Sequence, residues 1–250
     1  MYAIRAEFIK LKRSMSWVVV VLLPVVLVLA GSMMSLIDGN RLEDGWHTLW
    51  LRSFVFYGLF PLSAGIAILA SLVWRVEHRG SNWNALSAGP TSSLRIVVSK
   101  TAAIAVLATV MQLIAVATVV IIGVFAFGLP GFPPWRYLVA TVMIIAAAVP
   151  VAAFQSFLSM RMRSFAGPVL VAFLAACASS VMLVAEFGST VFISPYATLT
   201  RATQLGTATF ADTGTITGTV LASLAVASII LTAAPIAVST VRLERGEIRT

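Results

Sequence analysis

The stretch from Ser99 to Phe127, SKTAAIAVLATVMQLIAVATVVIIGVFAF, decides the fold class of this 250-residue chain. Apart from Lys100 at its start, it contains no acidic or basic residue. A bilayer core about 30 Å thick is crossed by roughly 20 helical residues, and lipid offers the backbone no hydrogen-bond partner. The stretch is long enough to cross such a core, and it alternates too little to be a strand of a membrane barrel. We therefore predict a transmembrane helix here.

The rest of the chain has the same character. Hydrophobic residues make up 60% of the sequence and charged residues 10%, whereas soluble domains have about 45–50% and about 25%. The mean hydropathy is +1.00. We therefore predict an all-α membrane protein in which residues 1–250 form a single transmembrane domain. Its six predicted spans are 17–37, 53–74, 99–127, 136–159, 165–187 and 215–240.

Three segments outside the spans have patterns of their own. Residues 1–14 alternate basic side chains with Ile4, Phe8 and Leu11 on one helical face, which predicts an amphipathic helix on the membrane surface. Residues 75–98 form a long loop with room for a short helix over 81–87, ended by a Gly-Pro pair. Residues 188–214 are not very polar, so we expect one or two short helices at the outer interface or dipping into it.

The basic residues fix the expected orientation. Of the 17 Lys and Arg residues, 13 fall on the side of the N-terminus and 4 on the other side. Cytoplasmic loops carry the excess of Lys and Arg, so we predict a multi-pass protein of a bacterial plasma membrane with both termini in the cytoplasm. The net charge of +8 does not indicate nucleic-acid binding, because it is spread over four separate segments.

The sequence contains no pattern typical of an enzyme. It has no phosphate-binding loop, no nucleophile elbow and no zinc-ligand spacing. The two histidines, His47 and His78, are predicted on opposite sides of the membrane, and the single cysteine, Cys177, lies in an apolar run. We therefore expect no catalytic residue, no metal site and no cofactor bound by this chain.

A few residues within the spans stand out. Gln112 and Gln155 are the most polar side chains at depth, and we interpret them as helix–helix hydrogen-bonding groups or, as an alternative, as part of a substrate path. Ala172, Ala176 and Ser180 recur at four-residue spacing, which favours close packing within the chain or a seam between two chains. The absence of charges well inside the spans argues against a proton- or sodium-coupled transporter.

The loop after the second span resembles a known family. The segment 77–90, EHRGSNWNALSAGP, followed by Arg95 and Lys100, is similar to the first cytoplasmic loop of type-2 ABC exporter permeases, and most of all to those of lantibiotic immunity and bacteriocin export. The segment 6–13, AEFIKLKR, is similar to the opening helix of that family. The resemblance implies an amphipathic elbow helix, six spans, a cytoplasmic coupling helix between the second and third spans, and re-entrant helices between the fifth and sixth.

The resemblance also implies a function. The chain would be the permease subunit of an ATP-driven exporter that confers immunity or resistance by exporting an antimicrobial peptide, a drug or a lipid-like substrate. A separate ATPase subunit would bind ATP and Mg²⁺, and a second permease copy or a paralogue would pair with this chain in the lipid membrane, along the seam of Ala172, Ala176 and Ser180. The alternative is a membrane scaffold or immunity protein that binds a ligand without pumping it. The residues expected to take force from the ATPase are Glu77, His78, Arg79, Trp83 and Leu86.

Overall fold

The computed structural model describes residues 7, 14–37, 42–79, 91–210 and 212–245. Most of the predicted amphipathic segment 1–14 and the whole of the predicted coupling helix over 81–87 lie outside these ranges. Within them, every regular element is a helix, and no strand is present. The all-α prediction is therefore confirmed for the described part of the chain.

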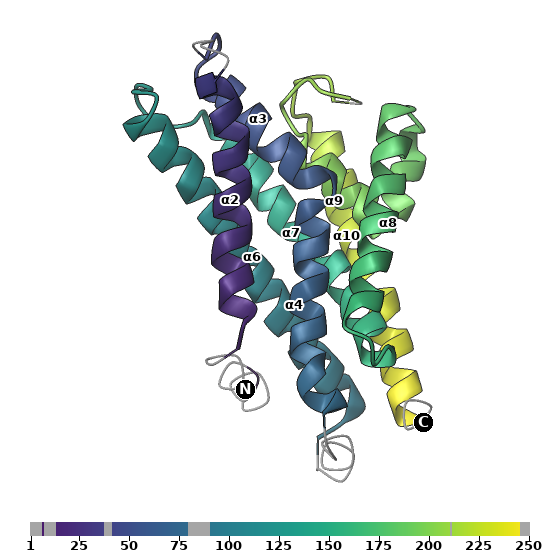
Figure 1. The fold of residues 1–250 in the computed structure, drawn as a ribbon. Coiled ribbons are helices and arrows are strands. Elements are labelled where there is room, and N and C mark those ends of the chain that lie inside the picture. The colour runs from purple at the N-terminus through teal and green to yellow at the C-terminus, as the bar shows by residue number, and fades with distance from the viewer. Residues whose placement is uncertain (1–6, 8–13, 38–41, 80–90, 211, 246–250) are drawn as a thin grey trace.

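Five of these helices are long and apolar enough to cross a membrane, and a bent pair, α3 and α4, can form a sixth span. In Figure 1 they run side by side along the length of the bundle. Each of the six predicted spans therefore has a counterpart. The elements are α2 (Ser16–Ile37), α3 (Trp46–Leu59), α4 (Pro61–His78), α6 (Ser93–Phe125), α7 (Trp135–Arg161), α8 (Ala166–Val184), the 3-10 helix η1 (Gly188–Ile193), α9 (Pro195–Thr203) and α10 (Gly218–Glu244).

The second span differs from its prediction as one helix over 53–74. It consists of α3 and α4, which meet at a bend of 50°. Phe60, between them, has non-helical backbone angles (φ −148°, ψ −28°), and Pro61 opens α4. Proline lacks an N–H group and disfavours the helical conformation of the residue before it, so the helix breaks at this point.

Other helix ends also differ from the predicted boundaries. The loop predicted over 75–98 is shorter at both ends, because α4 continues to His78 and α6 begins at Ser93. The last span begins later and ends later than predicted, since α10 covers Gly218–Glu244. The extensions of α4, α6 and α10 at the basic end follow from charged or polar residues that continue each helix beyond its apolar run, where hydropathy gives no boundary.

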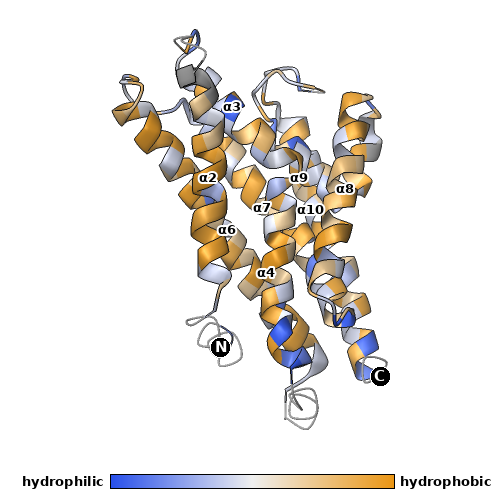
Figure 2. Ribbon diagram, in the orientation of Figure 1, coloured by the Kyte–Doolittle hydropathy of each residue, from blue (hydrophilic) through white to orange (hydrophobic). Residues whose placement is uncertain are grey.

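The outer surface of the bundle is apolar, as a lipid environment requires. Figure 2 shows hydrophobic residues over the length of the helices and the hydrophilic residues gathered mainly near the ends. Helix α7 packs against α4, α6, α9 and α10, and its buried face belongs to the main hydrophobic core. The large exposed side chains include Leu22 and Val26 on α2, Leu170 and Leu174 on α8, and Ile229 and Ile230 on α10.

We call one end of the bundle the basic end. Helices α4, α7 and α10 end there, and α2, α6 and α8 begin there (Figure 1). The first span therefore begins at the same end of the bundle at which the last span ends. The charged residues Arg75, Arg79, Arg95, Lys100, Arg161, Arg163, Arg242 and Arg245 belong to the helix ends and turns at this end. The distribution matches the asymmetry on which the predicted orientation depends.

The segment between α8 and α10 folds into the bundle. It contains η1 and α9, so it holds two short helices. Helix α9 packs against α3, α7 and α8, and Tyr196 and Leu199 are almost completely buried. A close approach holds it there: a Cβ atom on Gly58 of α3 would lie 1.8 Å from Oγ1 of Thr203. Only a glycine allows α3 and α9 to approach this closely.

Replacing Gly58 with alanine should therefore destabilise the packing of α3 on α9. Overpacking of this kind costs about 1–3 kcal/mol, because the short β-branched side chain of Thr203 has little freedom to move away. The thermal unfolding midpoint in detergent measures the loss, and a second substitution, Thr203→Gly, should restore part of it. An unchanged midpoint in Gly58→Ala alone would show that the two helices do not approach this closely.

Candidate functional site

A buried lysine joins three parts of the chain at the basic end. Nζ of Lys100, in the second turn of α6, lies 3.0 Å from Oε1 of Glu77 at the end of α4 and 3.1 Å from Oε2 of Glu7. The lysine is fully buried, and the two glutamates are 3% and 7% exposed. Nζ also lies 4.9 Å from the ring centroid of Trp74, so the ammonium group has an aromatic face beside its two carboxylates. We call Lys100, Glu7, Glu77 and Trp74 the Lys100 cluster.

The local helix geometry explains the Lys100 cluster. Trp74 and Glu77 are three residues apart on α4, so they occupy one face, the face turned toward α6. Lys100 Nζ has a third oxygen neighbour, the carbonyl of Val73, at 3.5 Å. An ammonium group has three donors, and all three therefore have an acceptor within reach. A buried charge is tolerated when it is paired and hydrogen-bonded in this way.

Two hydrogen bonds connect the same stretch of α4 to α7. The indole Nε1 of Trp74 donates to Oγ of Ser156 at 2.9 Å, and Nε2 of His78 donates to the carbonyl oxygen of Ser159 at 2.7 Å. Around them, Trp74 packs in a small hydrophobic cluster with side chains of α6 and α7. The ends of α4, α6 and α7 are therefore fixed to one another on both sides of the segment 79–92.

The predicted coupling residues have different positions. Glu77 is buried in the Lys100 cluster, so its carboxylate is not on a surface that a partner protein could contact. His78 is partly buried and bound to α7, and Arg79 is exposed just after α4. Trp83 and Leu86 lie outside the described residues, and their role remains a prediction.

Glu7 and Lys100 were not predicted from the sequence as functional residues. In the sequence, Lys100 stands out as one of the basic residues that fix orientation and as part of the family resemblance, but not as a site residue. A signal was present, because an ionisable residue bordering a long apolar run needs a partner, and such residues mark functional sites. The partners are 93 and 23 residues away in the sequence, and that pairing is visible only in the fold.

The two glutamines do not lie in one site. Nε2 of Gln155 on α7 donates to the hydroxyl oxygen of Tyr196 on α9 at 2.5 Å, as expected for a helix–helix hydrogen bond. Gln112 on α6 is buried, and neither of its amide atoms has a hydrogen-bond partner among the described residues. The substrate-path alternative for the two glutamines remains a prediction.

A second buried ion pair lies toward the other end of the bundle. Nη1 of Arg201 on α9 lies 2.8 Å from Oδ1 of Asp212, whose side chain is fully buried. Oδ2 of Asp212 accepts the backbone N–H groups of Ala208 and Gly214 at 3.1 and 2.9 Å. The pair therefore ties α9 to the loop that leads into α10. In the sequence, Arg201 is one of the four basic residues on the side opposite the N-terminus, and no pattern there pairs it with Asp212.

The small-residue stripe of α8 faces the chain's own bundle. Ala172 and Ala176 are fully buried in the main core, and Oγ of Ser180 donates to the carbonyl oxygen of Leu59 at 3.1 Å. This arrangement supports the intrachain alternative for these residues. Leu170, Leu174 and Val181 form the exposed part of α8 instead.

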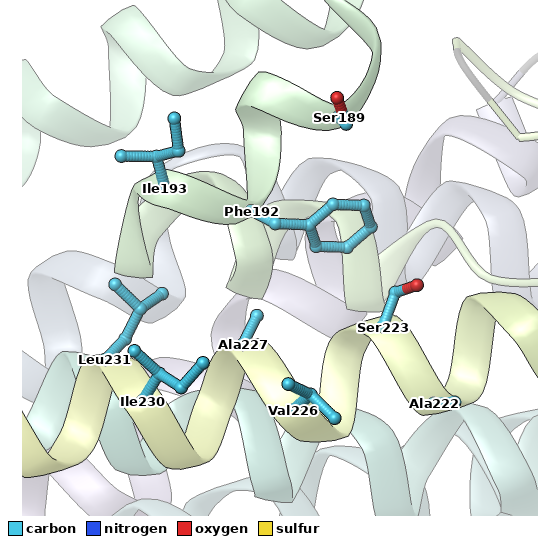
Figure 3. Close-up of a pocket in the computed structure, with 9 residues that line it drawn as sticks. All are labelled: Ser189, Phe192, Ile193, Ala222, Ser223, Val226, Ala227, Ile230 and Leu231. Atoms are coloured by element: carbon cyan, nitrogen blue, oxygen red, sulfur yellow. The ribbon is translucent and has the colours of Figure 1, made fainter.

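An apolar groove of about 650 Å³ lies between η1 and α10. Figure 3 shows Phe192 on the η1 side facing Ala227 and Val226 on α10, and Ser189 and Ser223 supply the only side-chain hydroxyl groups among the residues drawn. The groove can therefore give van der Waals contact to an apolar chain but no charge recognition. Among the described residues, no three His, Cys, Asp or Glu side chains gather where a metal ion could bind.

Comparison with known proteins places this architecture in a family. Residues 3–179 match the family model of the ABC-2 family transporter proteins, a range that includes the Lys100 cluster and α2 to most of α8. No curated protein sequence and no solved structure matches the chain. Proteins of the matched family are membrane transport components that associate with an ABC ATP-binding subunit. Because the match covers more than half of the sequence, this chain belongs to the ABC-2 transporter family, as a membrane permease component.

Proposed function

We propose that this chain is the permease subunit of an ATP-driven exporter in a bacterial plasma membrane, with its basic end in the cytoplasm. Family membership and the apolar six-span bundle support the transport role. The excess of Lys and Arg at one end supports the orientation. The substrate would be an antimicrobial peptide, a drug or a lipid-like molecule, and the place in lantibiotic immunity or bacteriocin export is part of this proposal.

The Lys100 cluster is the observation that supports this function most directly. It joins the end of α4 to the start of α6, the two helices on either side of the segment 79–92. In the proposed mechanism the ATPase contacts that segment through Trp83 and Leu86. Because α4, α6 and α7 are fixed to one another at this end, a displacement of the segment moves all three helices together. Glu77 and His78 then act as part of this joint, while Arg79 remains available to the ATPase.

The chain would work in a larger assembly. ATP and Mg²⁺ would be bound by a separate ATPase subunit, and a second copy or a paralogue would supply the other half of the permease. Since Ala172 and Ala176 are buried, pairing through α8 would use its exposed face, with Leu170, Leu174 and Val181. These side chains are apolar, as contacts between helices in lipid allow.

The test of this function is ATP hydrolysis by the reconstituted complex. Trp83→Ala should abolish the stimulation of the ATPase by the permease, because buried aromatic side chains carry much of the energy of an interface. The protein should still insert and fold, as judged by size-exclusion chromatography and thermal unfolding. The matched control is Trp17→Ala, which removes an exposed tryptophan at the start of α2, at the same end of the bundle.

Two results would contradict the proposal. If Trp83→Ala stimulated ATP hydrolysis as strongly as the wild type, that loop would not be the docking site of the ATPase. A purified, stable complex without any nucleotide-binding chain would favour the alternative of a ligand-binding scaffold or immunity protein. Copurification in mild detergent, followed by mass spectrometry of the accompanying chains, distinguishes the two functions.

A further inference from the structure

A small polar cavity lies at the basic end, between α4, the end of α7 and the turn that leads into α8. Its volume is about 210 Å³. Ser71 and Arg75 line it from α4, and Arg163 and Ser164 line it from the turn; no acidic side chain is among the described residues that line it. A water molecule occupies about 30 Å³ in the liquid, so the cavity accommodates a phosphate group but not a whole lipid.

The two arginines of this cavity have no counter-ion among the residues that the structure describes. Neither Arg75 nor Arg163 forms an ion pair or a hydrogen bond through its side chain within the described ranges, and Arg75 is in contact with the ring of Phe165, 5.8 Å from its centroid. Two guanidinium groups at one cavity repel each other, and an anion between them removes that repulsion. The guanidinium group also matches phosphate in geometry, because it can donate two parallel hydrogen bonds.

Neutral donors are present in the same cavity. Oγ of Ser164 accepts the backbone N–H of Gly167 at 3.3 Å, which leaves the hydroxyl hydrogen of Ser164 to donate to another acceptor. Helix α8 begins at Ala166, directly after the residues that line the cavity. The partial positive charge of a helix N-terminus adds to the attraction of the two arginines for an anion.

The surroundings of the cavity are apolar. Phe165 at the rim and Val76 on α4 are 40% and 39% exposed. A ligand with a phosphate head and acyl chains fits both parts, with its head in the cavity and its chains against Phe165 and Val76. Basic pockets between transmembrane helices bind lipid head groups in this way.

We propose that this cavity binds the phosphate head group of an anionic phospholipid, with Arg75 and Arg163 as its charge partners. The site is separate from the Lys100 cluster, since Glu77 and Lys100 do not line it. The proposal goes beyond transport: the permease would carry a bound lipid beside the joint of α4 and α7.

Native mass spectrometry of the full chain tests the proposal. The protein is released from vesicles of mixed phosphatidylglycerol and phosphatidylcholine, and lipid retention is compared between variants. The wild type should retain phosphatidylglycerol in preference to phosphatidylcholine. Arg75→Gln and Arg163→Gln should each weaken this retention about fivefold. Arg161→Gln is the matched control, because Arg161 is exposed at the end of α7 but does not line the cavity.

Several outcomes would overturn the proposal. An equal loss in Arg161→Gln would show attraction by general surface charge, and a lack of preference between the two lipids would show that the head group is not recognised. Thermal protection by inorganic phosphate in detergent, equal to that by phosphatidylglycerol, would assign the cavity to a free anion. Unchanged lipid retention in the Arg75→Gln/Arg163→Gln variant, together with weaker ATPase binding, would assign the arginines to the partner protein.

Discussion

Replacing Lys100 with methionine should lower the free energy of unfolding by about 3–5 kcal/mol, because it leaves Glu7 and Glu77 buried without the cation that they share. Methionine keeps the length and the apolar stem of the side chain, so the loss reports on the charge. The measurement is the thermal unfolding midpoint in detergent. In the reconstituted complex, we also expect permease-stimulated ATP hydrolysis to fall to the basal rate.

Two further variants make this prediction specific. Arg95→Met removes an exposed cation from the first turn of the same helix and should have an effect below about 1 kcal/mol. Replacing both carboxylates with glutamine in the Lys100→Met background should restore part of the stability, since no buried charge would remain. A midpoint for Lys100→Met that equals that of Arg95→Met would show that the Lys100 cluster is not buried as described.

Replacing Arg201 with methionine should have a comparable effect at the other end of the molecule. The carboxylate of Asp212 would remain fully buried and would keep only its two backbone donors, at a cost of about 3–5 kcal/mol. Because the pair fixes α9 to the loop before α10, hydrogen exchange should become faster in both segments. Thermal unfolding and hydrogen-exchange mass spectrometry measure the two effects.

The controls for Arg201 use the carboxylate side of the pair. Adding Asp212→Asn to Arg201→Met should recover stability, because the unpaired charge is removed while the shape is kept. Glu43→Gln changes an exposed carboxylate beside the start of α3 and should leave the midpoint unchanged. If the unfolding midpoint of Arg201→Met equalled that of Glu43→Gln, the ion pair would contribute nothing to the stability of α9 in the bundle.

The sequence predicted the spans well because lipid imposes a length and a composition on each of them. The run that begins with Lys100 illustrates this: its hydropathy predicted a spanning helix, and α6 is that helix. Helix ends were less accurate, because a helix continues past its apolar run wherever polar residues still form hydrogen bonds along it. The second span was predicted as one helix over 53–74, and the structure shows that it divides at Pro61 into two helices.

The candidate site could be predicted only in part. Glu77 was predicted as a site residue because it lies in the same segment as Trp83. Hydropathy does not show which helix the side chain of Glu77 faces, and its pairing with Lys100 depends on how α4 and α6 pack. The segment that contains α9 was expected at the outer interface or dipping into it, because it is not very polar for a loop. Its polar groups are satisfied inside the bundle, as the hydrogen bond from Gln155 to Tyr196 shows, and composition alone cannot reveal such partners.

The bend at Phe60 has a consequence for how the two ends of the bundle could move. Toward the basic end, α4 is bonded to α6 and α7. On the other side of the bend, α3 packs closely against α9 at Gly58. The second span thus consists of two helices that meet at a bend of 50°, rather than a single straight helix. A hinge at this bend would let α4 move while α3 stays in place, so that the proposed exporter need not open to both sides of the membrane at once.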